Sequence, residues 1–424
     1  MEEIFVTKVR INKVRHLENL EIPLSDTERK HLILTGKNGS GKTSVLEGIV
    51  TFLNWTTNNY IDNEILENNI IFFHEYRKKQ QEIEEELKYA KNLSSWKSGM
   101  IALERIKNEI REYETFITNN VPVELRYVSD FNRYFKILGR TDFIIKYFPS
   151  KRNFNPTEST GPQKIDLKDT YTINEDANTN FVKQLVNLRF DFLDSKDTGK
   201  NYEVEKIEKW FIKFETVLKA MFDDETLELV FDRPNFNYNI ITKNHNPFNL
   251  NQLSDGFAAF LSIVTEIMMR MDKKFTSQNP YDLQGIVLID EIETHLHIDL
   301  QKKILPFLTA FFPKIQFIVT THSPFVLSSI DNAVIYDLEK QIRVEDLSGY
   351  SVDGIIEGYF DSEKYSGTIK KKIEEYEQLM EKDILNDTEK DRLYFLDKYL
   401  DELPDFLSPE LQVKIQQIKL AKLV

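Results

Sequence analysis

The sequence predicts an α/β protein in which helices flank a mixed or parallel β-sheet. Two observations support this prediction. A β-rich run over His31–Thr35 leads through a glycine-rich loop into an amphipathic helix that starts at Lys42. Residues 253–338 then alternate between helix and strand, which is the pattern of a wound parallel sheet. Apolar residues make up 41% of the 424 residues, enough to bury a large core.

The composition excludes several classes of protein. The chain has no cysteine, so disulfides, thiolate zinc sites and cysteine nucleophiles are excluded. Its 55 basic and 69 acidic residues leave a net charge of −14, which argues against broad electrostatic binding of nucleic acid but leaves room for a local basic groove. The N-terminus lacks signal-peptide features, and no apolar run approaches the ~20 residues that span a bilayer. We therefore expect a cytoplasmic protein without a membrane partner.

The first half of the chain is expected to combine strands with a helical insertion. Alternating residues predict strands at Ile4–Val9 and Leu20–Leu24. Residues 62–118 are highly charged and helix-favouring, and they predict a helical hairpin with Ser94–Gly99 as its turn. The nine basic and nine acidic residues between His74 and Thr118 also suit an ordinary solvated pair of helices.

The rest of the chain continues this α/β pattern and ends in helices. A polar stretch over Lys151–Asn180 is expected to form a long loop. Further strands are expected at Val121–Val128, Thr141–Phe148, Leu227–Phe231 and Tyr238–Thr242, and helices at Phe181–Asp194, Val204–Met221, Lys364–Glu381, Asp387–Leu400 and Glu410–Leu423. We therefore expect a core of residues 1–60 and 120–340, a hairpin at 62–118 and a C-terminal helical region at 341–424.

The glycine-rich loop matches the phosphate-binding pattern G-x-x-x-x-G-K-[ST] in full. It follows a β run and opens a helix, as the mechanism requires. The glycines let successive N–H groups point at phosphate oxygens, and the helix N-terminus adds its positive dipole end. The candidate nucleotide-binding residues are Gly36, Asn38, Gly39, Ser40, Gly41, Lys42 and Thr43. Lys42 would neutralise the β and γ phosphates, and the Thr43 hydroxyl would hold Mg²⁺.

An acidic pair follows the apolar run Gly285–Ile289. Four consecutive apolar residues predict a strand buried on both faces. Two carboxylates at its end are costly to bury without a partner, and Mg²⁺ beside ATP supplies one. Asp290 then suits a magnesium ligand, and Glu291 suits the base that orients and deprotonates the attacking water. Taken alone, this pattern also fits a strand that ends in solvated carboxylates.

Two further motifs contain candidate nucleotide contacts. In Leu253–Phe257 (LSDGF), Ser254 and Gly256 lie at the start of a helix, where an anion can bind. A plain N-cap serine is the alternative. His322 ends the apolar run Phe317–Thr321, at the edge where the phosphates are expected, and suits a contact to the γ-phosphate. A histidine in the core or on the surface is the alternative there.

Together these motifs resemble the ABC-type ATPase heads of the SMC, RecF and OLD group. In that group GKNGSGKT is the phosphate loop, LSDGF the signature loop, LIDE the Walker B strand and TTHSP the switch-histidine segment. The resemblance implies that ATP is sandwiched between two heads, so that Ser254 and Gly256 serve the facing subunit. It also implies that Lys42, Thr43, Asp290, Glu291 and His322 keep the roles given above. The family's Q-loop glutamine has no clear counterpart, although Phe143–Phe154 is where it should lie.

The organisation looks most like the stand-alone ATPases of bacterial anti-phage systems, such as the PtuA family of Septu and the AriA family of PARIS. The Toprim nuclease domain of OLD proteins has no recognisable counterpart in the ~100 residues after His322. The resemblance therefore implies a dimer or higher homo-oligomer that binds ATP and Mg²⁺ and controls a separately encoded effector nuclease. The hairpin and residues 341–424 are the candidate docking segments. A RecF-like DNA-repair ATPase that acts on nucleic acid directly is the alternative.

Overall fold

The computed structural model describes residues 3–57, 61–89, 93–128, 143–152, 154–165, 167–243, 246–272, 283–344, 347–356, 367–380, 382 and 385–401. The chain divides into two compact units, Met1–Gly349 and Tyr350–Val424. The first unit contains all four motifs. The finer domain boundaries expected from the sequence stay predictions.

A six-stranded sheet forms the centre of the first unit, with the strand order β12-β11-β3-β10-β9-β5. Strands β11, β3, β10, β9 and β5 run parallel, and β12 pairs antiparallel at one edge. The bounds are β3 His31–Thr35, β5 Phe143–Phe148, β9 Gln284–Ile289, β10 Ile315–Thr320, β11 Ala333–Asp337 and β12 Ile342–Val344. The α/β fold class is confirmed. The central strands are apolar runs because helices or a second sheet cover both of their faces.

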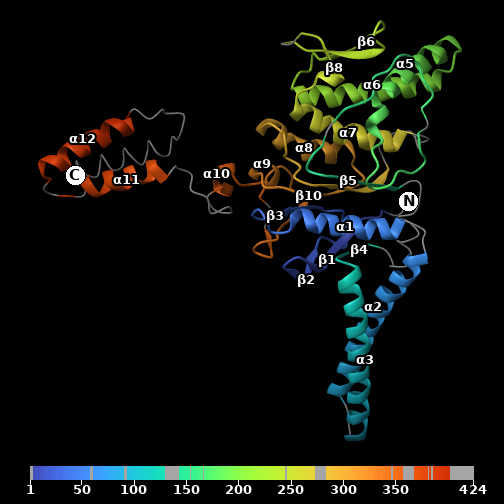
Figure 1. The fold of residues 1–424 in the computed structure, drawn as a ribbon, viewed down its shortest axis with the longest axis vertical. Helices are drawn as coiled ribbons and strands as arrows, with labels where there is room; N and C mark the ends of the chain where they lie inside the picture. Colours follow the sequence, from blue (N-terminus) through green and yellow to red (C-terminus); the bar gives the residue numbers. More distant parts are fainter. Residues whose placement is uncertain are drawn as a thin grey trace. The chain divides into compact units, whose positions relative to one another are not determined.

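A smaller antiparallel sheet lies on one side of the central sheet, with helix α1 between the two sheets (Figure 1). Its order is β2-β1-β4, with β1 Val6–Val14, β2 Leu17–Pro23 and β4 Val123–Tyr127. Helix α1, Lys42–Thr57, lies between the two sheets and buries Val45, Leu46 and Ile49 completely. A Cβ atom at Gly48 would lie 2.6 Å from Val123, so glycine allows the helix to approach the strand this closely. The main core therefore surrounds the helix that carries the phosphate loop.

The insertion between α1 and β4 is a helical hairpin, as expected. Helices α2, Ile61–Lys88, and α3, Leu93–Asn120, lie side by side (Figure 1). The Tyr76 and Tyr113 rings stack across the pair with their centroids 5.6 Å apart. The turn predicted at Ser94–Gly99 is wrong, because these residues already belong to α3. Only Gly99 favours a turn by its backbone, and the flanking apolar and charged residues extend the helix instead.

Four helices lie on the other side of the central sheet, with α7 and α8 next to the sheet and α5 and α6 farther out (Figure 1). They are α5 Phe181–Asp197, α6 Asn201–Phe222, α7 Asp255–Asp272 and α8 Ile298–Phe311. A third sheet contains β6 Glu228–Asp232, β7 Asn237–Ile241 and β8 Phe248–Asn249. The short helices are η1 Asn178–Asn180, η2 Leu250–Gln252 and α9 Pro324–Leu327. Helix α7 is almost wholly buried, so the motif that precedes it rests on a rigid element.

The second unit contains α10 Val352–Gly354, α11 Gly367–Met380 and α12 Asp387–Asp401. Helices α11 and α12 share a small apolar core made of Ile373, Tyr376, Leu379, Leu396 and Leu400. Tyr394 and Phe395 lie outside this core and are 72% and 50% exposed. The predicted helix Glu410–Leu423 lies outside the described residues.

Candidate functional site

The sheet topology brings three of the four motifs to one edge. The phosphate loop follows β3, the acidic pair follows β9, and His322 follows β10, which pairs with both of those strands. Because these neighbouring strands are parallel, the residues after each strand meet at the same edge of the sheet. Segments up to 286 positions apart, from Gly36 to His322, thus form one candidate nucleotide site, as the motifs predict.

The phosphate loop has the backbone geometry of an anion cradle. Gly36, Gly39 and Gly41 have φ values of 128°, 87° and 99°, a region that glycine enters without strain. A Cβ atom at Gly36 would lie only 2.9 Å from the Ser40 hydroxyl oxygen. The buried Ser40 hydroxyl has no hydrogen-bond partner among the described residues. This free hydroxyl and the curled backbone fit a phosphate group.

Lys42 lies folded over the loop. Its Nζ donates to the carbonyl oxygens of Gly36, at 2.7 Å, and Lys37, at 3.1 Å. Burial lowers the pKa of Lys42, while the carboxylates of Glu291 and Glu293 act in the opposite direction. The ammonium group is thus held at the mouth of the cradle by carbonyl groups that a phosphate can replace as its partners.

The Thr43 hydroxyl contacts the Asp290 carboxylate, at 3.0 Å from Oδ2. Asp290 is 2% exposed, and its Oδ1 also accepts from the Thr320 hydroxyl at 2.7 Å. A hydroxyl beside one carboxylate fits Mg²⁺ next to a nucleotide, because that ion takes few protein ligands and fills its shell with phosphates and water. No group of three or more acidic or histidine ligands occurs in the described part of the chain, so an all-protein metal cage is absent there.

Glu291 has an unusual backbone conformation that several contacts maintain. Its φ is +45°, in the left-handed region where a non-glycine residue costs about 1–3 kcal/mol. Its N–H donates to the Thr320 hydroxyl at 2.7 Å, and the Thr294 hydroxyl donates to its Oε2 at 3.1 Å. Both the main chain and the side chain of the candidate base are therefore held in place.

Arg152 supports the same loop and was missed from the sequence. Its guanidinium donates to the main-chain oxygens of Asp290, Glu291 and Ile292 at 2.7, 3.0 and 3.3 Å. Burial lowers its pKa to about 10, so it stays charged at neutral pH. Arg152 lies within Phe143–Phe154, where the Q-loop glutamine was expected. That stretch contains no glutamine.

His322 is anchored by a second acidic residue of the loop. The His322 N–H donates to Oε1 of Glu293 at 2.6 Å, and Oε2 of Glu293 is buried with no partner among the described residues. Burial and the nearby Lys42 ammonium lower the pKa of His322, so its imidazole is neutral at neutral pH. Glu293 lies two residues after Glu291, and no sequence motif identifies it as a site residue. Only the neighbouring strand reveals its role.

The signature motif lies apart from these residues. Ser254 is exposed at the start of α7, and its carbonyl oxygen accepts from Ala258 N–H at 2.8 Å. Gly256 packs against the loop after the acidic pair, since a Cβ atom there would lie 2.7 Å from the His295 oxygen. Within the described residues, the Ser254 side chain makes no hydrogen bond to Lys42, Asp290, Glu291 or His322. The structure does not bring this motif into the same site within one chain.

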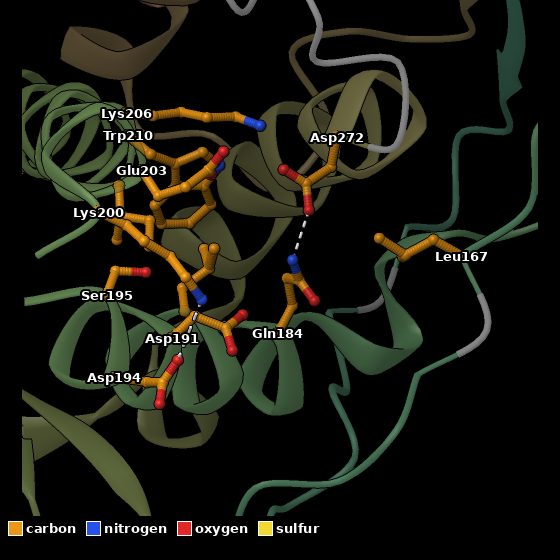
Figure 2. A pocket seen from close by; sticks show the side chains of 12 residues that line it. Leu167, Gln184, Asp191, Asp194, Ser195, Lys200, Glu203, Lys206, Trp210 and Asp272 are labelled. Atoms are coloured by element: carbon orange, nitrogen blue, oxygen red, sulfur yellow. Dashed lines mark hydrogen bonds and ion pairs between the residues drawn. The ribbon is translucent and has the colours of Figure 1, made fainter. Parts of the chain in front are cut away.

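A separate polar cavity of about 380 Å³ lies between α5, α6 and the end of α7 (Figure 2). Its carboxylates include Asp191, Glu203 and Asp272, and Trp210 forms part of its wall. Gln184 Nε2 donates to Asp272 Oδ2 at 2.5 Å. Burial nevertheless raises the pKa of Asp272 to about 6. None of the motif residues lines this cavity.

This fold and this site define a P-loop nucleotide-binding protein of the α/β class. The chain belongs to the family described as "AAA domain, putative AbiEii toxin, Type IV TA system", whose model matches residues 32–328. The motif residues of the candidate site all lie within that span.

Curated relatives agree with the resemblance read from the motifs. The chain is 25% identical to the Septu protein PtuA of Bacillus mycoides (strain KBAB4) over 368 residues, 84% of this chain and 44% of that protein. It is 24% identical to the Retron Vc95 probable ATPase of Vibrio cholerae serotype O1 biovar El Tor over 367 residues, 74% of this chain and 70% of that protein. Over 101 residues, 24% of this chain, it is 45% identical to the Retron Ec83 probable ATPase of Escherichia coli. The chain spans 44% and 19% of the lengths of PtuA and the Ec83 protein. The predicted similarity to the PtuA family is confirmed.

Solved structures similar to this chain include SMC heads. One is the SMC head domain from Thermotoga maritima, with a TM-score of 0.33 and 12% identity over 78% of this chain and 94% of that chain. Another is an Smc head bound to the C-winged helix domain of ScpA, with a TM-score of 0.36 and 12% identity over 81% of this chain and 95% of that chain. Among the described helices, none is long and apolar enough to cross a membrane.

Proposed function

We propose that the protein binds ATP with Mg²⁺ and hydrolyses it at the edge formed by β3, β10 and β9. The contact between Thr43 and Asp290 carries this proposal. It joins the end of the phosphate loop to the end of the acidic strand at 3.0 Å, in the arrangement that suits a magnesium ion beside a triphosphate. Mg²⁺, when bound, supplies charge neutralisation at the β and γ phosphates.

Each motif residue has a distinct task in this reaction. Loop N–H groups and Lys42 bind the phosphates, and Thr43 and Asp290 hold the metal ion. Glu291 orients the attacking water and takes its proton. Its backbone contact with Thr320 and its side-chain contact with Thr294 keep the carboxylate in a fixed orientation for this task. A neutral His322 beside Lys42 can donate one hydrogen bond to the γ-phosphate without adding charge.

We further propose that two copies of the chain, or a higher oligomer, complete the sites in trans. Ser254 is exposed, and no described contact connects it with the phosphate loop of its own chain. An exposed serine at the N-terminus of a long buried helix is available to the phosphates of a facing copy. Within its own chain Gly256 packs against His295 in the loop that follows Glu291, so binding of a facing copy at this motif would act next to the hydrolysis loop.

Mixed dimers test this arrangement. Ser254→Arg damages the site that faces it, and Lys42→Ala damages the site of its own chain. In a mixed dimer with apposed heads both defects fall on one site, so about half of the parent activity should reappear while each variant alone is inactive. Proven mixed dimers without recovery would contradict independent composite sites. Lys200→Arg, an exposed substitution outside both motifs, serves as the mixing control.

The biological setting that we propose is anti-phage defence, with ATP-dependent control of a separately encoded effector nuclease. Similarity to a Septu protein and to retron ATPases supports this proposal. Co-purification of the tagged protein with the products of neighbouring genes tests it. We expect a nuclease to co-elute in an ATP-dependent manner. Strong salt-dependent DNA binding by the protein alone, with no co-eluting partner, would instead support a DNA-repair ATPase.

A further inference from the structure

We propose that Arg152 is a positioning residue for ATP hydrolysis, a role that rests on the function proposed above. Its guanidinium holds the main chain of Asp290–Ile292 and thereby keeps Glu291 in the orientation that water activation requires. Arg152 lies after β5, the strand that pairs with β9 at the sheet edge. It is therefore placed beside the acidic loop by a different segment from those that carry the four motifs.

The contacts of Arg152 form a fork on consecutive carbonyl groups. One terminal nitrogen donates to Asp290 O at 2.7 Å and to Pro149 O at 3.2 Å. The other donates to Glu291 O at 3.0 Å and to Ile292 O at 3.3 Å. The guanidinium is a planar cation with several N–H donors, so it contacts three successive carbonyl groups at once.

The conformation of Glu291 explains why such a clamp is needed. Its φ of +45° is disfavoured for a side chain of this kind and persists only when neighbouring contacts hold it. Thr320 holds the N–H of Glu291 and Arg152 holds its carbonyl oxygen, so both sides of the residue are fixed. Without Arg152 the carbonyl oxygens of Asp290 and Ile292 lose this donor, and Glu291 O keeps only the Thr294 N–H at 2.9 Å, so the segment is less firmly held.

A direct role in nucleotide binding suits Arg152 less well. Its hydrogen bonds go to main-chain oxygens, and only 6% of the residue is exposed. The terminal nitrogens are thus already engaged, whereas Lys42 lies over the phosphate loop itself. A positioning role therefore predicts that substitutions of Arg152 lower kcat with little change in nucleotide affinity. A direct binding role predicts that they lower nucleotide affinity with little change in kcat.

A cavity next to Arg152 makes a specific rescue experiment feasible. It measures about 260 Å³, and its lining includes Pro149, Arg152, Asn178 and Ser262 together with the charged side chains of Lys146, Lys151 and Asp176. A water molecule occupies roughly 30 Å³ of liquid, so this space admits a small planar cation. Guanidinium at millimolar concentration, far below denaturing levels, can occupy the place of the lost side chain in Arg152→Ala.

The experiment compares steady-state ATP hydrolysis and nucleotide affinity in the full chain for Arg152→Ala, Arg152→Lys and the exposed neighbour Lys151→Met. We expect both Arg152 variants to lose kcat by ~100-fold, because a small misplacement of a reacting group has this effect, and to keep ATP affinity within about threefold. Guanidinium should restore part of the kcat of Arg152→Ala, and methylammonium should not. Lys151→Met should behave as the parent.

Several outcomes would overturn the inference. Full activity of Arg152→Lys would mean that charge alone matters, and a loss of affinity at unchanged kcat would make Arg152 a nucleotide ligand. Failure of guanidinium to rescue a folded Arg152→Ala protein would also count against a clamp. If Arg152→Ala does not fold, the kcat and affinity of Arg152→Lys decide. A parent protein that hydrolyses no ATP would refute the proposed function itself, which is a different result from an active Arg152→Ala protein.

Discussion

The Thr43 hydroxyl and the Asp290 carboxylate lie 3.0 Å apart although 247 positions separate them in the chain. Parallel pairing of β10 with both β3 and β9 creates this contact, because it aligns the ends of the strands that precede the two residues. The metal-binding half of the candidate site therefore depends on the correct sheet order. Any change that disrupts the register of β10 should separate Thr43 from Asp290.

Replacing Lys42 with alanine should abolish nucleotide binding. Lys42 is the cation over the phosphate cradle, and removing one member of a buried, hydrogen-bonded charge pair costs about 2–5 kcal/mol. We expect ATP affinity to fall by on the order of 100-fold or more. Calorimetric titration with ATP and Mg²⁺ measures this. Lys37→Ala is the matched control, since Lys37 lies in the same loop but is exposed and pairs with Glu339. Equal affinities for Lys42→Ala and the parent would refute the site.

Replacing Glu291 with glutamine should separate binding from hydrolysis. The amide keeps the size of the side chain but cannot take a proton from water, so kcat should fall by ~100-fold to 10,000-fold. ATP affinity should stay near that of the parent, and the ATP-bound dimer should accumulate in size-exclusion chromatography with ATP. Asp299→Asn, an exposed acid on α8, is the control. Parent-like turnover in Glu291→Gln would assign the base elsewhere.

His31 should make the folded state sensitive to mild acid. Burial lowers the pKa of His31 to about 4 from 6.5, and its Nδ1 accepts from Phe317 N–H at 3.1 Å. The unfolded chain therefore binds more protons between these pH values, so folding stability is full above pH 6.5 and decreases as the pH falls toward 4. A shift of this size corresponds to about 3 kcal/mol.

Urea unfolding between pH 7 and pH 4.5 measures this dependence. His31→Asn removes the titrating ring and keeps an acceptor near Phe317, so the fall in unfolding free energy with decreasing pH should become shallower. Asn should lower the stability at pH 7 because it fills less of the core. The same pH slope in the variant and the parent would show that other groups cause the acid sensitivity.

Deleting 350–424 should leave ATP binding intact and remove a partner contact or higher assembly. The cut follows the boundary of the second unit, whereas a cut at 385 would separate α11 from α12 and expose their shared core. The double variant Tyr394→Ser/Phe395→Ser provides a milder test, because both rings are largely exposed. ATP affinity and co-elution of neighbouring gene products are the readouts. Unchanged co-elution in both variants would refute docking through this unit.

Local patterns in the sequence predicted much of the first unit. The loop Gly36–Thr43 and helix α1 were predictable because their chemistry lies within a few consecutive residues. The strands before Asp290 and His322 were recognisable as apolar runs. The hairpin turn was misplaced, because a single Gly99 among helix-favouring residues does not end a helix.

Residue order alone determined the α/β class, the phosphate loop and the identity of the acidic and histidine candidates, since each depends on spacing along one segment. Tertiary structure decided which of these residues meet. It placed Thr43 against Asp290, His322 N–H on Glu293, and Arg152 under the loop of Glu291. The physical reason is that side chains and carbonyl groups on different strands become neighbours only through sheet pairing. Every residue has a main-chain carbonyl group, so the sequence does not indicate which carbonyl groups an arginine from another segment will contact.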